Sequence, residues 1–161
     1  MNQTLINVGV AQVKTGANPA VIRTILGSCI GICIFDRAKK IGGLAHILLP
    51  NDTSGGVNPE KYADTAIPLL VNRLIKEGAK KEFMSAKIAG GASMFKFQAN
   101  VSLGQIGDRN IEESKKSLEK LGIKLLEEDV GGNAGRVIDF FLTDGHLKVK
   151  ASGQEKMYYK V

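Results

Sequence analysis

The chain has 161 residues, of which 43% are hydrophobic and 24% charged, and a formal net charge of +6. This length predicts a single domain over residues 1–161, and the composition excludes a disordered or collagen-like chain. No apolar run approaches the roughly 18 residues of a membrane span, and the N-terminal segment lacks the layout of a signal peptide. We therefore expect no membrane insertion, a cytoplasmic location and two free thiols.

The basic charge, with an isoelectric point near 9.3, raises the question of nucleic-acid binding. The lysines are scattered as pairs such as Lys39 and Lys40, no basic run reaches five residues, and tryptophan is absent. This pattern lacks the signatures of nucleic-acid-binding modules, so we expect a solvated basic surface and no nucleic-acid partner. Attraction of an acidic protein partner is the alternative interpretation.

The first third of the chain has the alternation of β-strands. Strands are predicted near residues 6–10, over residues 24–35 and, after a polar turn, over residues 41–49. Both faces of the segment 24–35 are apolar, which predicts a strand buried on both sides. The following segment 50–59 is rich in turn-forming residues and is predicted to be a mobile surface loop.

Two helices are predicted from apolar residues at three- and four-residue spacing. The first covers residues 58–78, with a cap and a proline at its start and a glycine at its end. Pro68 interrupts it, so either the helix is kinked there or its regular part begins near Thr65. The second helix covers residues 108–122.

Further short strands are predicted over residues 84–88, 123–126, 136–142 and 147–151. Asp144-Gly145 lies between the last two and is a strong hairpin signal. Together, these predicted elements form a mixed α+β domain with more strand than helix.

Cys29 and His46 are the pair of residues that could carry out catalysis. If the turn between the two strands leaves residues 36–39 as the loop, Phe35 pairs with Lys40 and Cys29 lies directly opposite His46. Side chains placed so have Cβ atoms about 4.5–5.5 Å apart. A histidine at this distance can take the thiol proton and stabilise the thiolate as an ion pair.

Ordinary core packing is the competing explanation. Buried cysteines usually only pack, and Cys33 on the same strand face fits that role. Cys29 differs because Gly27 and Ser28 precede it, and small residues there permit a ligand to approach the backbone closely. Two cysteines and two histidines without metal-site spacing predict no metal, and the glycine-rich segments match no dinucleotide or phosphate-loop motif, so no cofactor is expected.

Several sequence blocks together closely resemble the CheD family of bacterial chemotaxis. They follow the family order and span nearly the whole chain: TILGSCIG at 24–31, GLAHILLP at 43–50, KYADTA at 61–66, AKIAGGASMF at 86–95, IGDRN at 106–110, EDVGGN at 128–133 and GR at 135–136.

The resemblance implies a protein-glutamine deamidase that converts selected glutamines of methyl-accepting chemotaxis receptors to glutamate and releases ammonia. It implies Cys29 as the nucleophile, His46 as the base and Thr24 as the third member of the triad. It also implies a layered sandwich of two packed mixed β-sheets with helices on one side, similar to the cytotoxic necrotizing factor toxins. Oxyanion donors are expected from the backbone around Gly27 and Ser28.

Family resemblance also suggests a second role, in which the chain binds the CheC phosphatase and acts as a regulatory interaction module. Docking of a helical receptor calls for a shallow groove over the nucleophile. For this contact we nominate the loop 51–58 and the segment 90–100, where Met94, Phe95 and Phe97 are apolar. The alternative is that these aromatic residues fill the core.

Overall fold

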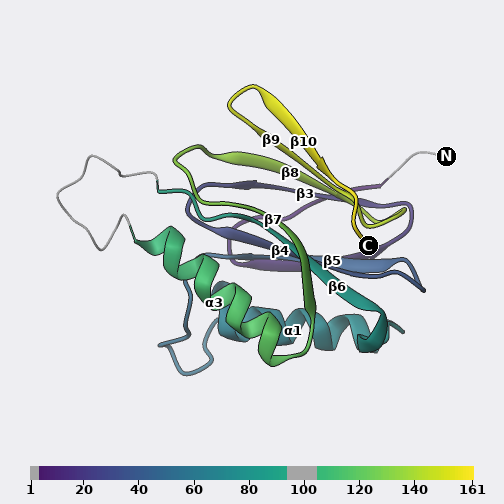
Figure 1. Ribbon diagram of the computed structural model, residues 1–161. Coiled ribbons are helices and arrows are strands. Elements are labelled where there is room, and N and C mark those ends of the chain that lie inside the picture. The colour runs from purple at the N-terminus through teal and green to yellow at the C-terminus, as the bar shows by residue number, and fades with distance from the viewer. Residues whose placement is uncertain (1–3, 94–104) are drawn as a thin grey trace.

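The computed structural model describes residues 4–93 and 105–161, which form three layers: an outer sheet, a central sheet and a pair of helices (Figure 1). The outer sheet has five strands, in the order β1 (Leu5–Asn7), β3 (Val21–Leu26), β8 (Arg136–Phe141), β9 (Leu147–Ala151) and β10 (Gln154–Tyr158). The central sheet also has five, in the order β2 (Gln12–Ala17), β5 (Ile41–Ile47), β4 (Ile30–Asp36), β6 (Met84–Gly90) and β7 (Lys124–Val130).

Both sheets are mixed, because β1 runs parallel to β3 and β6 parallel to β7, whereas the other neighbours are antiparallel. Helices α1 (Ala63–Lys76) and α3 (Ile106–Lys120) cover the face of the central sheet that points away from the outer sheet (Figure 1). This confirms the predicted α+β sandwich with helices on one side. Likeness to the necrotizing factor toxins stays a prediction. No described helix is long and apolar enough to cross a membrane.

Two hydrophobic cores lie on the two faces of the central sheet. Every residue of β4 is buried, with Ile30, Ile32 and Ile34 in the core under the helices, and Cys33 and Phe35 in the core between the sheets. The double-sided burial predicted for this strand is confirmed. Each fully buried aliphatic side chain contributes about 1.5–3 kcal/mol of transfer free energy. The isoleucines of β4 therefore contribute strongly to the stability of the fold.

The predicted single strand over residues 24–35 is wrong. The chain leaves the outer sheet at the end of β3, crosses through Gly27, Ser28 and Cys29, and enters the central sheet at Ile30. Alternation of apolar residues continues across the break and therefore did not reveal it. This crossing, which we call the crossover loop (residues 27–29), carries the candidate nucleophile.

Helix α1 begins at Ala63, later than predicted. The preceding segment forms a short 3₁₀ turn, η1 (Pro59–Lys61), because the Lys61 carbonyl accepts hydrogen bonds from the backbone N–H groups of Leu48 and Leu49 and is thereby tied to the end of β5. Pro68 lies inside α1, which continues past it to Lys76. Helix α3 begins two residues before its predicted start.

Most other differences between the predicted and the observed strands lie at the polar edges of the sheets. Strands β2 and β10 were not predicted, and β7 extends further than predicted, because these edge strands carry exposed polar residues that weaken the apolar alternation. Near the N-terminus, regular pairing is limited to Leu5–Asn7. A second 3₁₀ turn, η2 (Lys81–Phe83), leads into β6. The hairpin predicted around Asp144-Gly145 joins β8 to β9.

Candidate active site

The pairing of β4 with β5 differs from the predicted register. Gly31, not Cys29, lies opposite His46, and Asp36 pairs with Ile41. Asp36 is fully buried, and its carboxylate accepts hydrogen bonds from the N–H groups of Ala38 and Lys39 at 2.8 and 2.9 Å, so this side chain closes the turn one residue later than predicted. A shift of two residues in register preserves the alternation of faces. Cys29 and His46 therefore still share the face that points to the outer sheet, as diagonal rather than direct neighbours.

Thr24 meets His46 across the two sheets. Thr24 points inward from β3, and its Oγ1 lies 2.7 Å from Nδ1 of His46 on β5. The same hydroxyl lies 2.6 Å from the backbone carbonyl oxygen of Val8. The carbonyl can only accept, so the single hydroxyl proton goes to Val8 and Thr24 accepts a hydrogen bond from Nδ1–H.

This chain of hydrogen bonds selects the tautomer of the neutral imidazole. With the proton on Nδ1, the lone pair of His46 is on Nε2. Nε2 is buried and has no hydrogen-bond partner within residues 4–93 and 105–161. An unpartnered imidazole nitrogen in a core is costly unless a ligand or reactant uses it.

Burial keeps both members of the Cys29–His46 pair uncharged at neutral pH. Cys29 is 8% exposed and His46 1% exposed. Loss of hydration lowers the pKa of His46 to about 4. The same effect raises the pKa of the Cys29 thiol, against a smaller opposing contribution from its own backbone N–H. Both shifts favour the uncharged thiol and imidazole over the thiolate–imidazolium pair expected from the sequence, because burial penalises the charged forms.

Cys33 has the properties of a packing residue. Its side chain is 1% exposed and lies in the core between the sheets. Burial raises the pKa of its thiol well above the ordinary value. The structure thus distinguishes the two cysteines, because Cys29 lies in the crossover loop and Cys33 in the middle of β4.

Hydrogen bonds hold all three carbonyl groups of the crossover loop. The Gly27 carbonyl accepts from Ala92 N–H at 3.0 Å and the Cys29 carbonyl from Gly91 N–H at 2.9 Å. The Ser28 carbonyl accepts from the side-chain amide of Asn110 at 3.0 Å. In the part of the chain that the structure describes, the N–H groups of Ser28 and Cys29 donate to no backbone carbonyl.

Gly90 makes the close approach to this loop possible. Its φ of +109° is strained for other residues, and a Cβ atom there would lie 2.2 Å from the carbonyl oxygen of Cys29. The Gly90-Gly91 pair in the sequence thus reflects contact with the crossover loop rather than a phosphate-binding motif.

A buried arginine organises the glycine-rich segment beside Gly90. Arg136 donates from Nε to Asp129 at 2.9 Å, from Nη2 to the Gly131 carbonyl at 2.9 Å and from Nη1 to the Gly90 carbonyl at 3.3 Å. Tyr158 donates to the other oxygen of Asp129 at 2.6 Å. No sequence pattern predicts a role for Arg136 or Asn110. Both lie in the sequence blocks that carry the family resemblance, which was the available signal.

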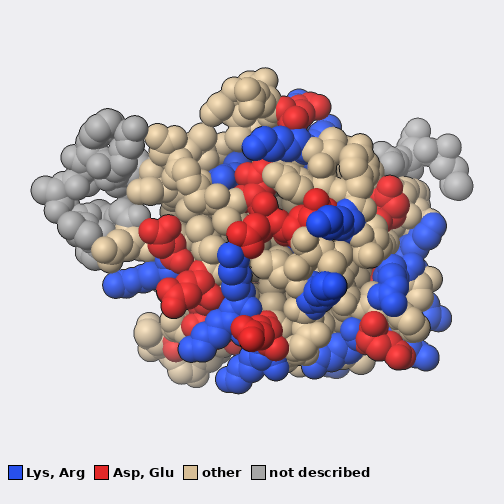
Figure 2. All heavy atoms as spheres, in the orientation of Figure 1, with Lys and Arg blue, Asp and Glu red and all other residues tan. Residues whose placement is uncertain are grey.

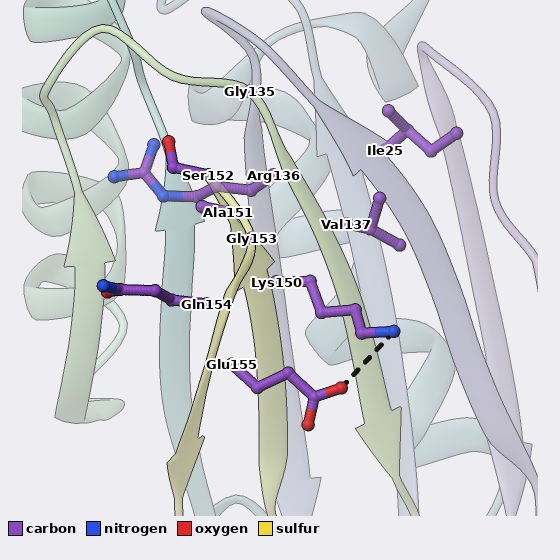
Figure 3. Close-up of a pocket in the computed structure, with 10 residues that line it drawn as sticks. All are labelled: Ile25, Gly135, Arg136, Val137, Lys150, Ala151, Ser152, Gly153, Gln154 and Glu155. Atoms are coloured by element: carbon purple, nitrogen blue, oxygen red, sulfur yellow. Dashed lines mark ion pairs between the residues drawn. The ribbon is translucent and has the colours of Figure 1, made fainter.

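A groove on the solvent face of the outer sheet does not contain the candidate triad. Figure 3 shows Ile25 and Val137 on adjacent strands at one side of the groove, and Lys150 paired with Glu155 at 3.3 Å on the β9–β10 hairpin. Ile25 points to solvent, whereas its neighbour Thr24 points to the core. The groove and the candidate active site are thus on opposite faces of β3.

Charges on the face shown in Figure 2 are interspersed, with acidic side chains beside the basic ones. The pair Lys115–Glu128, at 2.9 Å, is one contact of this kind, between α3 and β7. The predicted loop at 51–58 is mostly exposed, and Asn51 joins it to Glu113 of α3 by a hydrogen bond of 2.8 Å. The predicted contact residues Met94, Phe95 and Phe97 lie outside the described residues.

A thiol and an imidazole with a selected tautomer are groups that cysteine-dependent hydrolases use for acyl transfer. The comparisons then assign the chain to one family. The family model described as CheD chemotactic sensory transduction matches residues 48–151. The chain belongs to the CheD family.

Curated relatives match along almost their whole length, and those that follow are named probable chemoreceptor glutamine deamidase CheD. The protein of Desulfitobacterium hafniense (strain DSM 10664 / DCB-2) is 50% identical, over 91% of this chain and 92% of the relative. That of Clostridium novyi is 46% identical, over 95% and 96%. That of Methanococcus vannielii is 44% identical, over 94% and 98%. The structure of a hypothetical protein, YfiH of Bacillus licheniformis, gives a TM-score of 0.49 at 13% identity, over 73% of this chain and 49% of that chain.

Proposed function

We propose that this chain is a cytoplasmic deamidase that hydrolyses the side-chain amide of specific chemoreceptor glutamines, with Cys29 as nucleophile, His46 as general base and Thr24 as the residue that orients the imidazole. The family and the names of its relatives support the reaction and the substrate. The observation that carries the assignment of residues is the 2.7 Å contact between Thr24 Oγ1 and His46 Nδ1, which leaves the basic Nε2 for the thiol.

The first chemical step couples proton transfer to attack, because both groups begin uncharged. The Cys29 sulfur bonds to the glutamine amide carbon while its proton passes to Nε2 of His46, and the amide oxygen becomes an oxyanion. The N–H groups of Ser28 and Cys29 are the donors that would stabilise this oxyanion. Thr24 accepts a hydrogen bond from Nδ1–H throughout, and its own hydroxyl proton is not transferred. The imidazolium therefore keeps one hydrogen bond in the core.

Collapse of the intermediate releases ammonia and regenerates the enzyme. His46 returns its proton to the leaving nitrogen, the C–N bond breaks, and a thioester joins Cys29 to the receptor side chain. Water then adds to the thioester with loss of a proton to His46, and the C–S bond breaks as His46 returns that proton to the departing sulfur. The products are glutamate and the free thiol, and no metal or cofactor takes part.

The test uses the whole chain and a purified receptor cytoplasmic fragment. Mass spectrometry should locate glutamines that gain about one dalton in the presence of the wild-type chain. Cys29→Ala should abolish the gain, and the matched Cys33→Ala should preserve it. Deamidation by Cys29→Ala, or loss of deamidation only in Cys33→Ala, overturns the assignment of the nucleophile.

Binding of the CheC phosphatase remains a prediction of the resemblance. An adaptor that works only by binding keeps its effect in Cys29→Ala, whereas an enzyme loses it. Complementation of chemotaxis by this variant therefore separates the two functions.

A further inference from the structure

We infer that Asn110 of α3 is a positioning residue, which holds the crossover loop against the end of β5 and thereby sets the geometry between Cys29 and His46. The inference rests on the proposed function and adds a residue to it. Asn110 is completely buried. Its side-chain nitrogen donates to the Ser28 carbonyl at 3.0 Å and to the Leu48 carbonyl at 3.1 Å.

The two carbonyls belong to the two segments that bear the candidate nucleophile and base. Ser28 directly precedes Cys29, and Leu48 follows His46 by two residues. The last β4–β5 pair is Ile30 with Ile47, so both carbonyls lie just beyond the end of the regular pairing. A single amide group therefore connects segments that the sheet itself no longer connects.

Other contacts show why the sheet cannot make this connection. Beyond Ile47 the N–H of Leu48 donates to the Lys61 carbonyl, and before Ile30 the Cys29 carbonyl accepts from Gly91. Both groups are thus bonded to segments outside the β4–β5 pair rather than to each other. Among the described residues, the side chain of Asn110 bonds to both the crossover loop and the end of β5.

Helix α3 is placed to hold the whole crossover loop. Gly107 lies one turn before Asn110, and a Cβ atom there would lie 2.5 Å from the Gly91 carbonyl oxygen and 2.8 Å from that of Ala92. Gly91 and Ala92 are the residues whose N–H groups hold the carbonyls of Cys29 and Gly27. The helix therefore holds Ser28 directly, through Asn110, and supports the flanking carbonyls through the segment against which it packs.

The buried side-chain amide of Asn110 has an energetic cost. In the described part of the chain, Oδ1 of Asn110 is buried without a hydrogen-bond partner. A buried polar atom left unpaired is destabilising. An apolar residue would avoid this penalty but could not bridge two carbonyls, so the position is better explained by positioning than by packing.

The matched control lies on the same helix. Ser114 is one turn beyond Asn110, is also fully buried, and has an Oγ without a partner among the described residues. Ser114→Ala removes a buried polar group whose Oγ makes no hydrogen bond to the crossover loop or to β5 in the described part of the chain. Asn110→Asp changes one atom of the side chain, keeps its shape, and replaces the bridging donor by an acceptor that the two carbonyls repel.

The experiment measures kcat and KM for the receptor fragment per folded chain, well below the unfolding temperature. Asn110→Asp is expected to lower kcat by about 10²-fold, the cost of a misplacement near 1 Å, with KM within twofold of wild type. Ser114→Ala should leave both unchanged. Asn110→Gln, which keeps the donor on a longer side chain, should recover part of the loss. If Asn110→Asp does not fold, Asn110→Ser is measured in its place, since its side chain is too short to bridge both carbonyls.

A kcat within threefold of wild type in the folded Asn110 variants would overturn the positioning role. Equal losses in the Asn110 and Ser114 variants would overturn it as well, because they would indicate general damage to α3. Failure of the proposed function is distinguishable, since it is tested by Cys29→Ala: deamidation by that variant refutes the nucleophile whatever Asn110 does.

Discussion

Thr24 and His46 belong to different sheets, yet their side chains are 2.7 Å apart and link the two layers. The link continues to the Val8 carbonyl at 2.6 Å, which orients the threonine hydroxyl. Threonine carries no charge, unlike the aspartate that supports histidine in many hydrolases. Burial accounts for a His46 pKa near 4, against a smaller opposing contribution from a hydrogen bond with the Val8 backbone.

Thr24→Val should separate the role of the hydroxyl from that of the side-chain shape. Loss of one hydrogen bond of about 1–1.5 kcal/mol is expected to lower kcat roughly tenfold, because Nδ1 is then free to lose its proton and Nε2 to gain it. Thr24→Ser keeps the hydroxyl and should retain most activity. Steady-state deamidation kinetics provide the measurement, and a Thr24→Val variant with wild-type kcat would refute the orienting role.

The stability of the protein should fall between pH 6.5 and pH 4 because of His46. The pKa of His46 is about 4 in the folded chain, against the ordinary histidine value of 6.5 that applies to the unfolded chain. In this window the unfolded chain binds a proton that the folded chain does not, so stability decreases as the pH falls. The decrease from this one group amounts to at most about 3 kcal/mol.

Urea unfolding of wild type and His46→Gln at pH 7 and pH 4.5 measures this effect. The carboxylates contribute equally in both proteins, so the difference between the two pH dependences belongs to His46. The expected result is a smaller loss of stability in the variant. Parallel curves would show that His46 ionises normally in the folded chain.

Alkylation of Cys29 by iodoacetamide should be slow at pH 7 and should rise with pH through pH 9. The reason is that burial raises the pKa of this thiol, so the reactive thiolate is scarce at neutral pH. Cys33 should stay unmodified in the folded chain because it is fully enclosed. Mass spectrometry of Cys33→Ala and Cys29→Ala assigns the label to one thiol. A rate already at its plateau near pH 6 would instead favour the ion pair expected from the sequence.

Gly90→Ala should reduce both stability and activity, whereas Gly78→Ala should affect stability alone. The two glycines have nearly the same φ, +109° and +106°. A Cβ atom at Gly78 meets nothing within 4 Å, while one at Gly90 would lie 2.2 Å from the Cys29 carbonyl oxygen. Backbone strain of about 1–3 kcal/mol is common to both variants.

The contact with Cys29 is therefore the difference between them. Thermal unfolding and deamidation rates of the two variants make the comparison. Equal activities would mean that the position of the crossover loop does not matter for catalysis.

The Cys29–His46 pair shows what the sequence patterns could predict and what they could not. Alternation along each strand correctly placed both side chains on one face, because a strand has a period of two and a shift of two residues leaves the faces unchanged. The register itself was wrong. It depends on the buried Asp36 carboxylate, which closes the turn through hydrogen bonds to Ala38 and Lys39, and no periodic signal reports such a bond.

The sequence by itself determined the local elements: the fully buried strand around Ile32, the two helices, the hairpin at Asp144-Gly145 and, through its motifs, the family. Only the tertiary structure decided that β3 and β4 belong to different sheets, that Thr24 reaches His46 between them, and that Asn110 reaches Ser28 from α3, 82 residues away. Local patterns record the period and polarity of each segment. Pairing between distant segments, and the desolvation that keeps Cys29 and His46 uncharged, arise only when the layers pack together.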